Sequence, residues 1–310
     1  MKTVTCRIFT GDRMRVVVPE IVGNELCRRG YIEPDLTRVL LGTLRPGMVF
    51  VDVGAHYGYH SLVASRAVGA TGRVVALEPG RRVLPLLRAN TAAAGNITVD
   101  AVAACALTAT VVLRDYGPEN SALSTIGAGA RVPPDERHHL RAEQYAVPGV
   151  ALDDHLLARD VRPDFVKLDA EGAELDILRG MRRILTEVAP VLAVEVGDYE
   201  GMTSPATAAC LDHLDRLGYR ALEWSPGGLR PHLRRARYGY GNLFFVKGDR
   251  RIDHVPGDEH IFVGGVDRPV LEADAVGHPI DAEVAHGLRP PPDDRPRDRD
   301  DQPVDEPAPQ

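Results

Sequence analysis

The chain has 310 residues, 44% of them hydrophobic, and a formal net charge of −7 at pH 7. This size and apolar content suffice for one large domain with additional segments. The negative charge argues against nucleic-acid binding, which requires a basic face, and no stretch is apolar for long enough to cross a membrane. Four cysteines without paired spacing indicate neither a zinc site nor a disulfide framework, so we expect a cytoplasmic protein.

The first 46 residues predict an extension in front of the core. Residues 3–9 and 14–18 flank a turn at Gly11-Asp12 and predict a β-hairpin. A helix is expected over residues 34–44, and a Pro-Gly pair at 46–47 marks the break before the core.

Residues 47–248 alternate between strand and helix, which predicts a doubly wound α/β domain with a mostly parallel sheet. Seven strands are expected, near residues 48–53, 73–78, 97–102, 163–168, 190–196, 219–224 and 243–247. Helices are expected near residues 58–68, 80–94, 173–186 and 205–217. Residues 103–162 are too many for a simple crossover, and strand-like sequence at 108–114 and 145–152 predicts a β-rich insertion over the mouth of the site.

The C-terminal part differs in composition from the core. We expect residues 249–285 to form an extension, within which the periodicity fades after residue 263. Residues 286–310 are mostly proline and charged side chains, which bury too little apolar surface to offset the entropy of ordering. This tail is therefore predicted to be disordered.

A glycine-bearing turn follows the first core strand. The strand ends in Asp52, and Gly54 and Gly58 permit a tight turn and the close approach of a ligand. The second strand ends in Glu78, followed by Pro79. An acid at this position can accept two hydrogen bonds from a ribose diol.

The turn does not favour a phosphate-bearing ligand. Position 56 is His, so the pattern Gly-x-Gly-x-x-Gly is absent, and no Walker lysine is present. Asp52 would repel a pyrophosphate but suits a cationic amino-acid group. The combination favours S-adenosylmethionine, which carries an ammonium, a sulfonium and a ribose diol but no phosphate.

The most informative block is residues 164–174, where a buried strand is expected to run into a helix. Asp169, Glu171 and Glu174 lie at this junction, at the edge where open α/β sheets bind ligands. Lys167 lies in the strand, although the chain has only three lysines against thirty-four arginines. Acidic capping of a helix start is the structural alternative. Three carboxylates within six residues, beside a strand lysine, favour a functional site instead.

These blocks resemble the FkbM-type S-adenosylmethionine-dependent methyltransferases, which are mostly O-methyltransferases. The matching segments are residues 30–34, 51–58, 75–79 and 164–174, within a resemblance over about residues 15–248. It implies a Rossmann-like class I methyltransferase fold with the last strand antiparallel, and a hydroxylated small molecule, of sugar or natural-product type, as substrate. The implied cofactor contacts are Glu33, Asp52, Gly54, His56, Gly58, Glu78, Pro79 and Asp169. The family usually has Asn where this chain has His56.

Methyl transfer to a hydroxyl requires in-line positioning and a group that takes the hydroxyl proton. Asp169 and Glu171 are the predicted bases, Lys167 is expected to pair with one of them, and His56 and His60 are alternative bases. Because side chains alternate along a strand, Lys167 and Asp169 should share a face of the sheet. Alternatively, Asp169, Glu171 and Glu195 offer oxygen ligands to a divalent metal such as Mg²⁺, which would bind and acidify a diol.

Two other functions remain open from the sequence. An NAD-dependent oxidoreductase would share the doubly wound sheet, but His56 in the turn and Asp52 before it weaken that alternative. A non-catalytic S-adenosylmethionine-binding protein would also keep the fold. The acid cluster argues against it, because an idle site has no need for buried charge.

Overall fold

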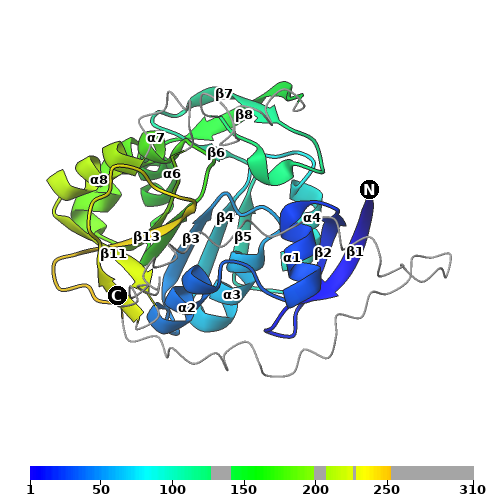
Figure 1. Ribbon diagram of the computed structural model, residues 1–310, viewed down its shortest axis with the longest axis horizontal. Coiled ribbons are helices and arrows are strands. Elements are labelled where there is room, and N and C mark those ends of the chain that lie inside the picture. Colours follow the sequence, from blue (N-terminus) through cyan, green and yellow to red (C-terminus); the bar gives the residue numbers. More distant parts are fainter. Residues whose placement is uncertain (127–140, 199–206, 226–227, 253–310) are drawn as a thin grey trace, which may run out of the picture. The chain divides into compact units, whose positions relative to one another are not determined.

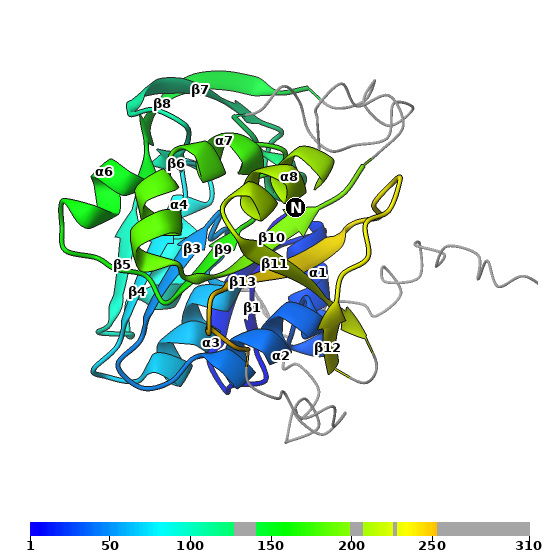
Figure 2. The same ribbon diagram turned by 90° about the vertical axis from the view of Figure 1, so that its left-hand side faces the viewer.

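The structure is a computed structural model that describes residues 1–126, 141–198, 207–225 and 228–252. The strands of its main sheet are β3 (Val49–Val53), β4 (Arg73–Leu77), β5 (Ile97–Asp100), β9 (Phe165–Leu168), β10 (Val191–Val196), β11 (Tyr219–Ser225), β12 (Gly228–Pro231) and β13 (Gly241–Lys247). They lie in the order β12-β11-β13-β10-β9-β3-β4-β5 (Figures 1 and 2). Strands β5, β4, β3, β9 and β10 are parallel, and β13 runs antiparallel between β10 and β11.

The sheet contains all seven predicted strands, and the antiparallel last strand that the resemblance implies is confirmed. The count of seven is nevertheless wrong, because β12 pairs with β11 and makes an eighth strand at the edge. Its sequence offers a single large apolar residue, Leu229, and ends in Pro231, which only an edge strand tolerates. Such a segment carries no alternating pattern that sequence reasoning can detect.

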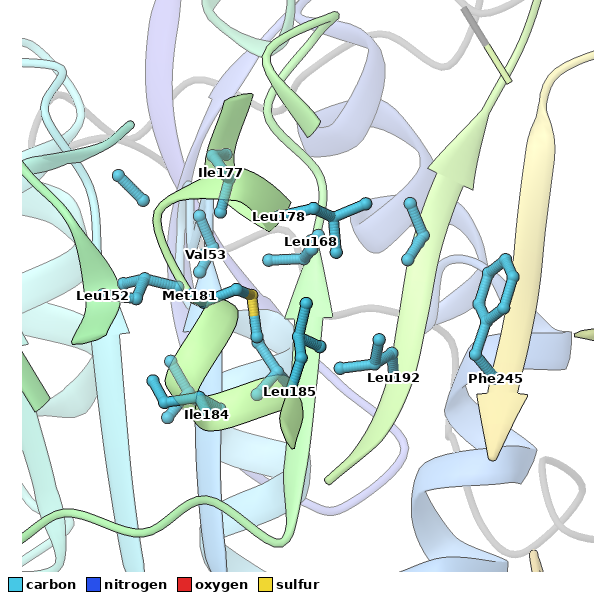
Figure 3. Close-up of a cluster of buried hydrophobic side chains, with 14 of the residues drawn as sticks. Val53, Leu152, Leu168, Ile177, Leu178, Met181, Ile184, Leu185, Leu192 and Phe245 are labelled. Carbon is cyan, nitrogen blue, oxygen red and sulfur yellow. The ribbon is translucent and has the colours of Figure 1, made fainter. Parts of the chain in front are cut away.

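Helices cover both faces of this sheet. They are α2 (Pro34–Thr43), α3 (Tyr59–Val68), α4 (Leu84–Thr91), α6 (Leu152–Leu157), α7 (Glu174–Arg179) and α8 (Thr207–Arg216). On one face Val53, Leu168 and Leu192 pack against α6, α7 and α8 (Figures 2 and 3). On the other face Phe50 and Phe165 pack against α2 and α3. Strand alternation therefore directs every second side chain of β3 and β9 toward α2 and α3.

The helix predicted over residues 173–186 is two short pieces, α7 and a π-helical turn at Ile184–Val188. The chain breaks at Gly180, where a Cβ atom would lie 2.1 Å from the carbonyl oxygen of Cys105. The Asp153 carboxylate then accepts hydrogen bonds from the backbone N–H groups of Arg183 (2.7 Å) and Ile184 (2.8 Å). A distant backbone and a distant carboxylate thus override the helical periodicity. Helix α4 is also shorter than the predicted 80–94.

The N-terminal hairpin is confirmed as β1 (Lys2–Arg7) and β2 (Arg13–Val18). A helix that the sequence did not predict, α1 (Ile21–Arg29), follows it and is capped by Glu20, which accepts a hydrogen bond from the N–H of Gly23 at 2.8 Å. The hairpin and α1 bury a common apolar cluster with the start of α3. This packing places α1 beside the carboxyl edge of the main sheet.

A second, small sheet has the order β6-β8-β7 and contains β6 (Ala103–Ala104), β7 (Ala109–Asp115) and β8 (Glu143–Val150). The segments predicted as strands at 108–114 and 145–152 correspond to β7 and β8. Glu143 pairs with Arg81 and Arg82, which ties this sheet to the loop after β4.

The predicted tail 286–310 and all but the first four residues of the predicted extension 249–285 lie outside the described residues. Within the described ranges, no helix combines the length and apolar character needed to cross a membrane.

Candidate active site

A cavity of about 590 Å³ opens at the carboxyl ends of β3, β4 and β9. Its walls come from the turn after β3, the ends of β4 and β9, helix α1 and the segment Ser121–Ile126, which includes a short 3₁₀ turn. The sequence-predicted residues that line it are Glu33, Gly54, His56, Glu78, Pro79, Lys167, Asp169 and Glu171, together with His60. Asp52, Gly58 and Glu195 are not among the described lining residues.

The turn after β3 is held close to two neighbouring strands. The N–H groups of Gly54 and Ala55 both donate to the carbonyl of Leu77 at 3.1 Å. Gly54 has a φ of +73°, and a Cβ atom there would lie 1.8 Å from the carbonyl oxygen of Asp169. At Gly58 an added Cβ would instead meet the side chain of Leu87. Gly54 is therefore required by the close approach of the backbone at Asp169, and Gly58 by its φ of +89°. The tight turn expected from the sequence is confirmed, and the approach of a ligand stays a prediction.

His56 occupies a left-handed backbone position in this turn, with a φ of 48°. Asn and His are among the residues that adopt this conformation most readily, so His56 is sterically compatible with the turn. Its Nε2 atom lies 2.9 Å from Ser121 Oγ. Burial lowers the pKa of His56 to about 3, so the imidazole is neutral at physiological pH and is a weak base.

Glu78 presents its carboxylate to the cavity from the end of β4. Oε2 accepts the backbone N–H of His56 at 2.9 Å, and Oε1 accepts that of Gly80 at 2.7 Å. The residue is 8% exposed, and burial raises its pKa to about 7. Each oxygen has a further lone pair, so the carboxylate can accept two more hydrogen bonds from a diol.

Lys167 is the centre of a buried ion cluster. Its Nζ lies 3.0 Å from Asp169 Oδ2 and 3.3 Å from Asp52 Oδ1, and it donates to the carbonyl of Gly54 at 3.1 Å. Burial alone would lower the pKa of Lys167, but the Asp169 and Asp52 carboxylates outweigh it and raise the pKa above its usual range. The prediction that Lys167 and Asp169 share a face is confirmed, and Asp52 also accepts a hydrogen bond from Ser61 Oγ at 2.6 Å.

Three further polar side chains meet on the same side of the sheet. Glu33 precedes α2 with a φ of 41°, and its Oε1 accepts a hydrogen bond from Asn242 Nδ2 at 2.6 Å. Its other oxygen, Oε2, lies 3.6 Å from Nε2 of His60. The link between Glu33 and Asn242 spans 209 positions of sequence, a pairing that sequence spacing cannot indicate.

The proximity of the three acids proposed as metal ligands is confirmed. Asp169, Glu171 and Glu195 place carboxylate oxygens within 4.8 Å of one another. Glu171 has a φ of 50°, and its carbonyl accepts a hydrogen bond from Thr125 Oγ1 at 2.8 Å. The proximity of three carboxylates does not by itself show an ion, so metal binding stays a prediction.

Sequence reasoning missed several residues of this wall. Ser121 and Tyr240 both line the cavity, and Ser121 also contacts His56. Neither lies in a motif or in a patterned element, so no sequence signal pointed to them. Tyr240 directly precedes β13, which places it beside the strand that carries Asn242.

The basic run at residues 230–237 forms ion pairs with acidic side chains of neighbouring elements. Glu223 of β11 pairs with Arg230, His232 and Arg235. Arg234 pairs with Asp212 of α8. These contacts favour a structural role for the run.

The strand order and an acid-lined cavity at the carboxyl edge define a doubly wound α/β protein with a ligand site at that edge. The sequence profile of the methyltransferase FkbM domain matches residues 52–221, which is 170 of the 310 residues. The chain belongs to the FkbM methyltransferase family. No curated protein matches it.

Solved structures with a similar fold include a methyltransferase FkbM from Methylobacillus flagellatus KT, at 22% identity and a TM-score of 0.41. That match covers 66% of this chain and 48% of the other, so the chain spans about half the length of that protein. The O-methyltransferase TomG from Streptomyces achromogenes, in complex with SAM, is 16% identical with a TM-score of 0.37, over 70% of this chain and 82% of TomG. At these scores the structures add nothing to the family assignment.

Proposed function

We propose that this protein is an S-adenosylmethionine-dependent O-methyltransferase that methylates a hydroxyl of a small molecule. The observation that carries the proposal is the Glu78 carboxylate, which faces the cavity beside the turn after β3 in a chain of the FkbM methyltransferase family. Bound S-adenosylmethionine supplies an electrophilic methyl group on a sulfonium.

The residues of the cavity fit that cofactor. Both Glu78 oxygens are fixed by backbone N–H groups, and their remaining lone pairs would accept hydrogen bonds from a ribose diol. The wall beyond Gly54 carries Asp169 and Glu171, whose negative charge suits the ammonium and the sulfonium. Asp52 lies behind this wall and pairs with Lys167, so it would influence the cofactor through Lys167 and not by direct contact.

The acid-lined end of the cavity is the proposed position of the acceptor hydroxyl. Glu33, Asp169 and Glu171 all line this end and are the candidates for taking its proton. Lys167 holds Asp169 in place through their ion pair. His56 is a poor candidate because its pKa is about 3 and its Nε2 contacts Ser121.

The size of the cavity favours a small-molecule acceptor. The cavity volume of about 590 Å³ lies within the usual range for small-molecule sites. It must also hold the cofactor, so the acceptor is of modest size. A sugar or a natural product with a free hydroxyl meets this requirement.

Calorimetry with S-adenosylhomocysteine and with NAD⁺ tests the cofactor. We expect S-adenosylhomocysteine to bind at about micromolar Kd, or roughly −8 kcal/mol, and NAD⁺ to give no heat. The acceptor is then sought by incubating the protein with S-adenosylmethionine and a panel of hydroxylated metabolites, with mass spectrometry of the products. Binding of NAD⁺ without binding of S-adenosylhomocysteine would overturn the proposal. Binding of S-adenosylhomocysteine with no methylated product from any acceptor class would favour the non-catalytic alternative.

A further inference from the structure

Glu33 and His60 form an incomplete polar pair in the wall of the cavity. Their nearest polar atoms, Glu33 Oε2 and His60 Nε2, are 3.6 Å apart, which is too long for a hydrogen bond. An oxygen atom to one side of the pair, about 2.8 Å from each of these two atoms, would bridge them by hydrogen bonds. Both residues line the cavity. His60 Nε2 itself has almost no accessible surface, so a ligand atom reaches it through a small shift of the cavity wall.

The Nε2 atom of His60 has no hydrogen-bond partner among the described residues. The residue is 4% exposed, and this atom is buried. Burial, and the charge of Lys167, hold the pKa of His60 well below its usual range, so the ring is neutral. A buried polar atom without a partner is costly, and one that faces a cavity indicates a ligand contact.

Glu33 is held in place more firmly than an ordinary surface glutamate. Its Oε1 accepts a hydrogen bond from Asn242, and the Glu33 side chain is only 18% exposed. Glu33 therefore keeps one oxygen available to a ligand while the other fixes its orientation.

We propose that Glu33 Oε2 and His60 Nε2 together bind the acceptor hydroxyl, and that Glu33 takes its proton during methyl transfer. In this arrangement His60 donates its Nε2–H to the hydroxyl oxygen, and the hydroxyl donates to Glu33. The oxygen forms a bond to the methyl carbon as the carbon–sulfur bond breaks, with that electron pair going to sulfur. The proton moves to Glu33 and then to solvent. This inference rests on the proposed function and identifies the proton acceptor within it.

The charges around Glu33 suit this role. Burial and the nearby Asp169 carboxylate raise its pKa to about 7, against the opposing effect of Lys167. The titratable groups that face it are Asp52, Tyr59, His60, Lys167, Asp169 and Tyr240. A base whose pKa lies near the working pH is the most effective in proton transfer.

Glu33→Gln tests the role, because it keeps the shape and the contact with Asn242 while removing the charge. Glu20→Gln is the matched control: Glu20 is also buried with a pKa of about 7, but it caps α1 and is not among the described residues that line the cavity. A melting temperature close to that of the wild type would show that each variant is folded.

Two ligands separate an acceptor-side role from a cofactor-binding role. Sinefungin carries an ammonium where the methylated sulfonium stands, and S-adenosylhomocysteine has no charge there. We expect Glu33→Gln to weaken sinefungin about tenfold, because the ammonium loses a facing carboxylate, and to leave the Kd of S-adenosylhomocysteine within about twofold. Glu20→Gln should change neither. Equal weakening of both ligands, or of neither, would overturn the inference. If the wild type binds neither ligand, the proposed function itself fails.

Turnover of the acceptor found in the metabolite panel gives the second readout. Glu33→Gln should lower kcat about a hundredfold or more with little change in KM. The kcat of the wild type and of Glu20→Gln should fall as the pH drops below about 7, whereas the residual kcat of Glu33→Gln should not. A variant Glu33→Gln with near-normal kcat would overturn the inference even if methyl transfer itself is confirmed.

Discussion

Replacing Lys167 by methionine tests the ion cluster behind the active site. Lys167 is 2% exposed and compensates two carboxylates, of which Asp52 is fully buried. Removing one partner of a buried ion pair usually costs about 3–5 kcal/mol. In a domain of this size each kcal/mol lowers the melting temperature by roughly 2–4 °C. We therefore expect Lys167→Met to melt about 10 °C below the wild type.

Lys247→Met provides the matched control. Lys247 donates to the carbonyl of Leu185 and lies over the ring of Tyr219, and no described carboxylate pairs with it. Its loss should cost about 1–2 kcal/mol, because one hydrogen bond and one cation–π contact disappear. Thermal melts of both variants at pH 7.5, followed by circular dichroism, give the comparison.

The double variant Asp52→Asn, Lys167→Met distinguishes uncompensated charge from lost packing. Asparagine keeps an acceptor for Ser61 but carries no charge. The double variant should therefore melt several degrees above Lys167→Met, since the two changes are coupled. A Lys167→Met protein within about 2 °C of the wild type, or a double variant no more stable than the single one, would refute the electrostatic reasoning.

Three further predictions concern the cavity. Glu78→Gln should weaken S-adenosylhomocysteine about tenfold in calorimetry, because it replaces one acceptor oxygen by a donor. The wild-type affinity should fall from pH 8 to pH 6, because the pKa of Glu78 is about 7 and its protonated form accepts fewer hydrogen bonds, and this dependence should shrink in the variant. Gly54→Ala should prevent folding or cost more than about 3 kcal/mol, whereas Gly11→Ala, which also has a positive φ (+89°) but nothing within 4 Å, should cost about 1 kcal/mol in urea unfolding. EDTA should leave turnover unchanged, because Lys167 already compensates Asp169; a loss restored by Mg²⁺ would instead assign the acid cluster to a metal.

The sequence was sufficient for the parts of the site that depend on local pattern. Strand periodicity placed Lys167 and Asp169 on one face, and their ion pair confirms it. The acid at the end of β4 was likewise found from its position alone. Contacts between distant segments could not be predicted, because the spacing of residues along the chain does not indicate which distant segments meet. The bond from Asn242 to Glu33 and the backbone contact that breaks a helix at Gly180 are both of this kind.

The place of β13 in the main sheet has a consequence for biosynthesis. Although it is the last strand among the residues that the structure describes, it lies between β10 and β11. While the polypeptide leaves the ribosome, β10 has no neighbour on that side until residue 247 has emerged. Strand β10 is buried along its whole length in the finished protein, so the nascent chain exposes an unpaired apolar edge for about fifty residues of translation. A chaperone that shields exposed strand edges would therefore protect this chain most during that interval of translation.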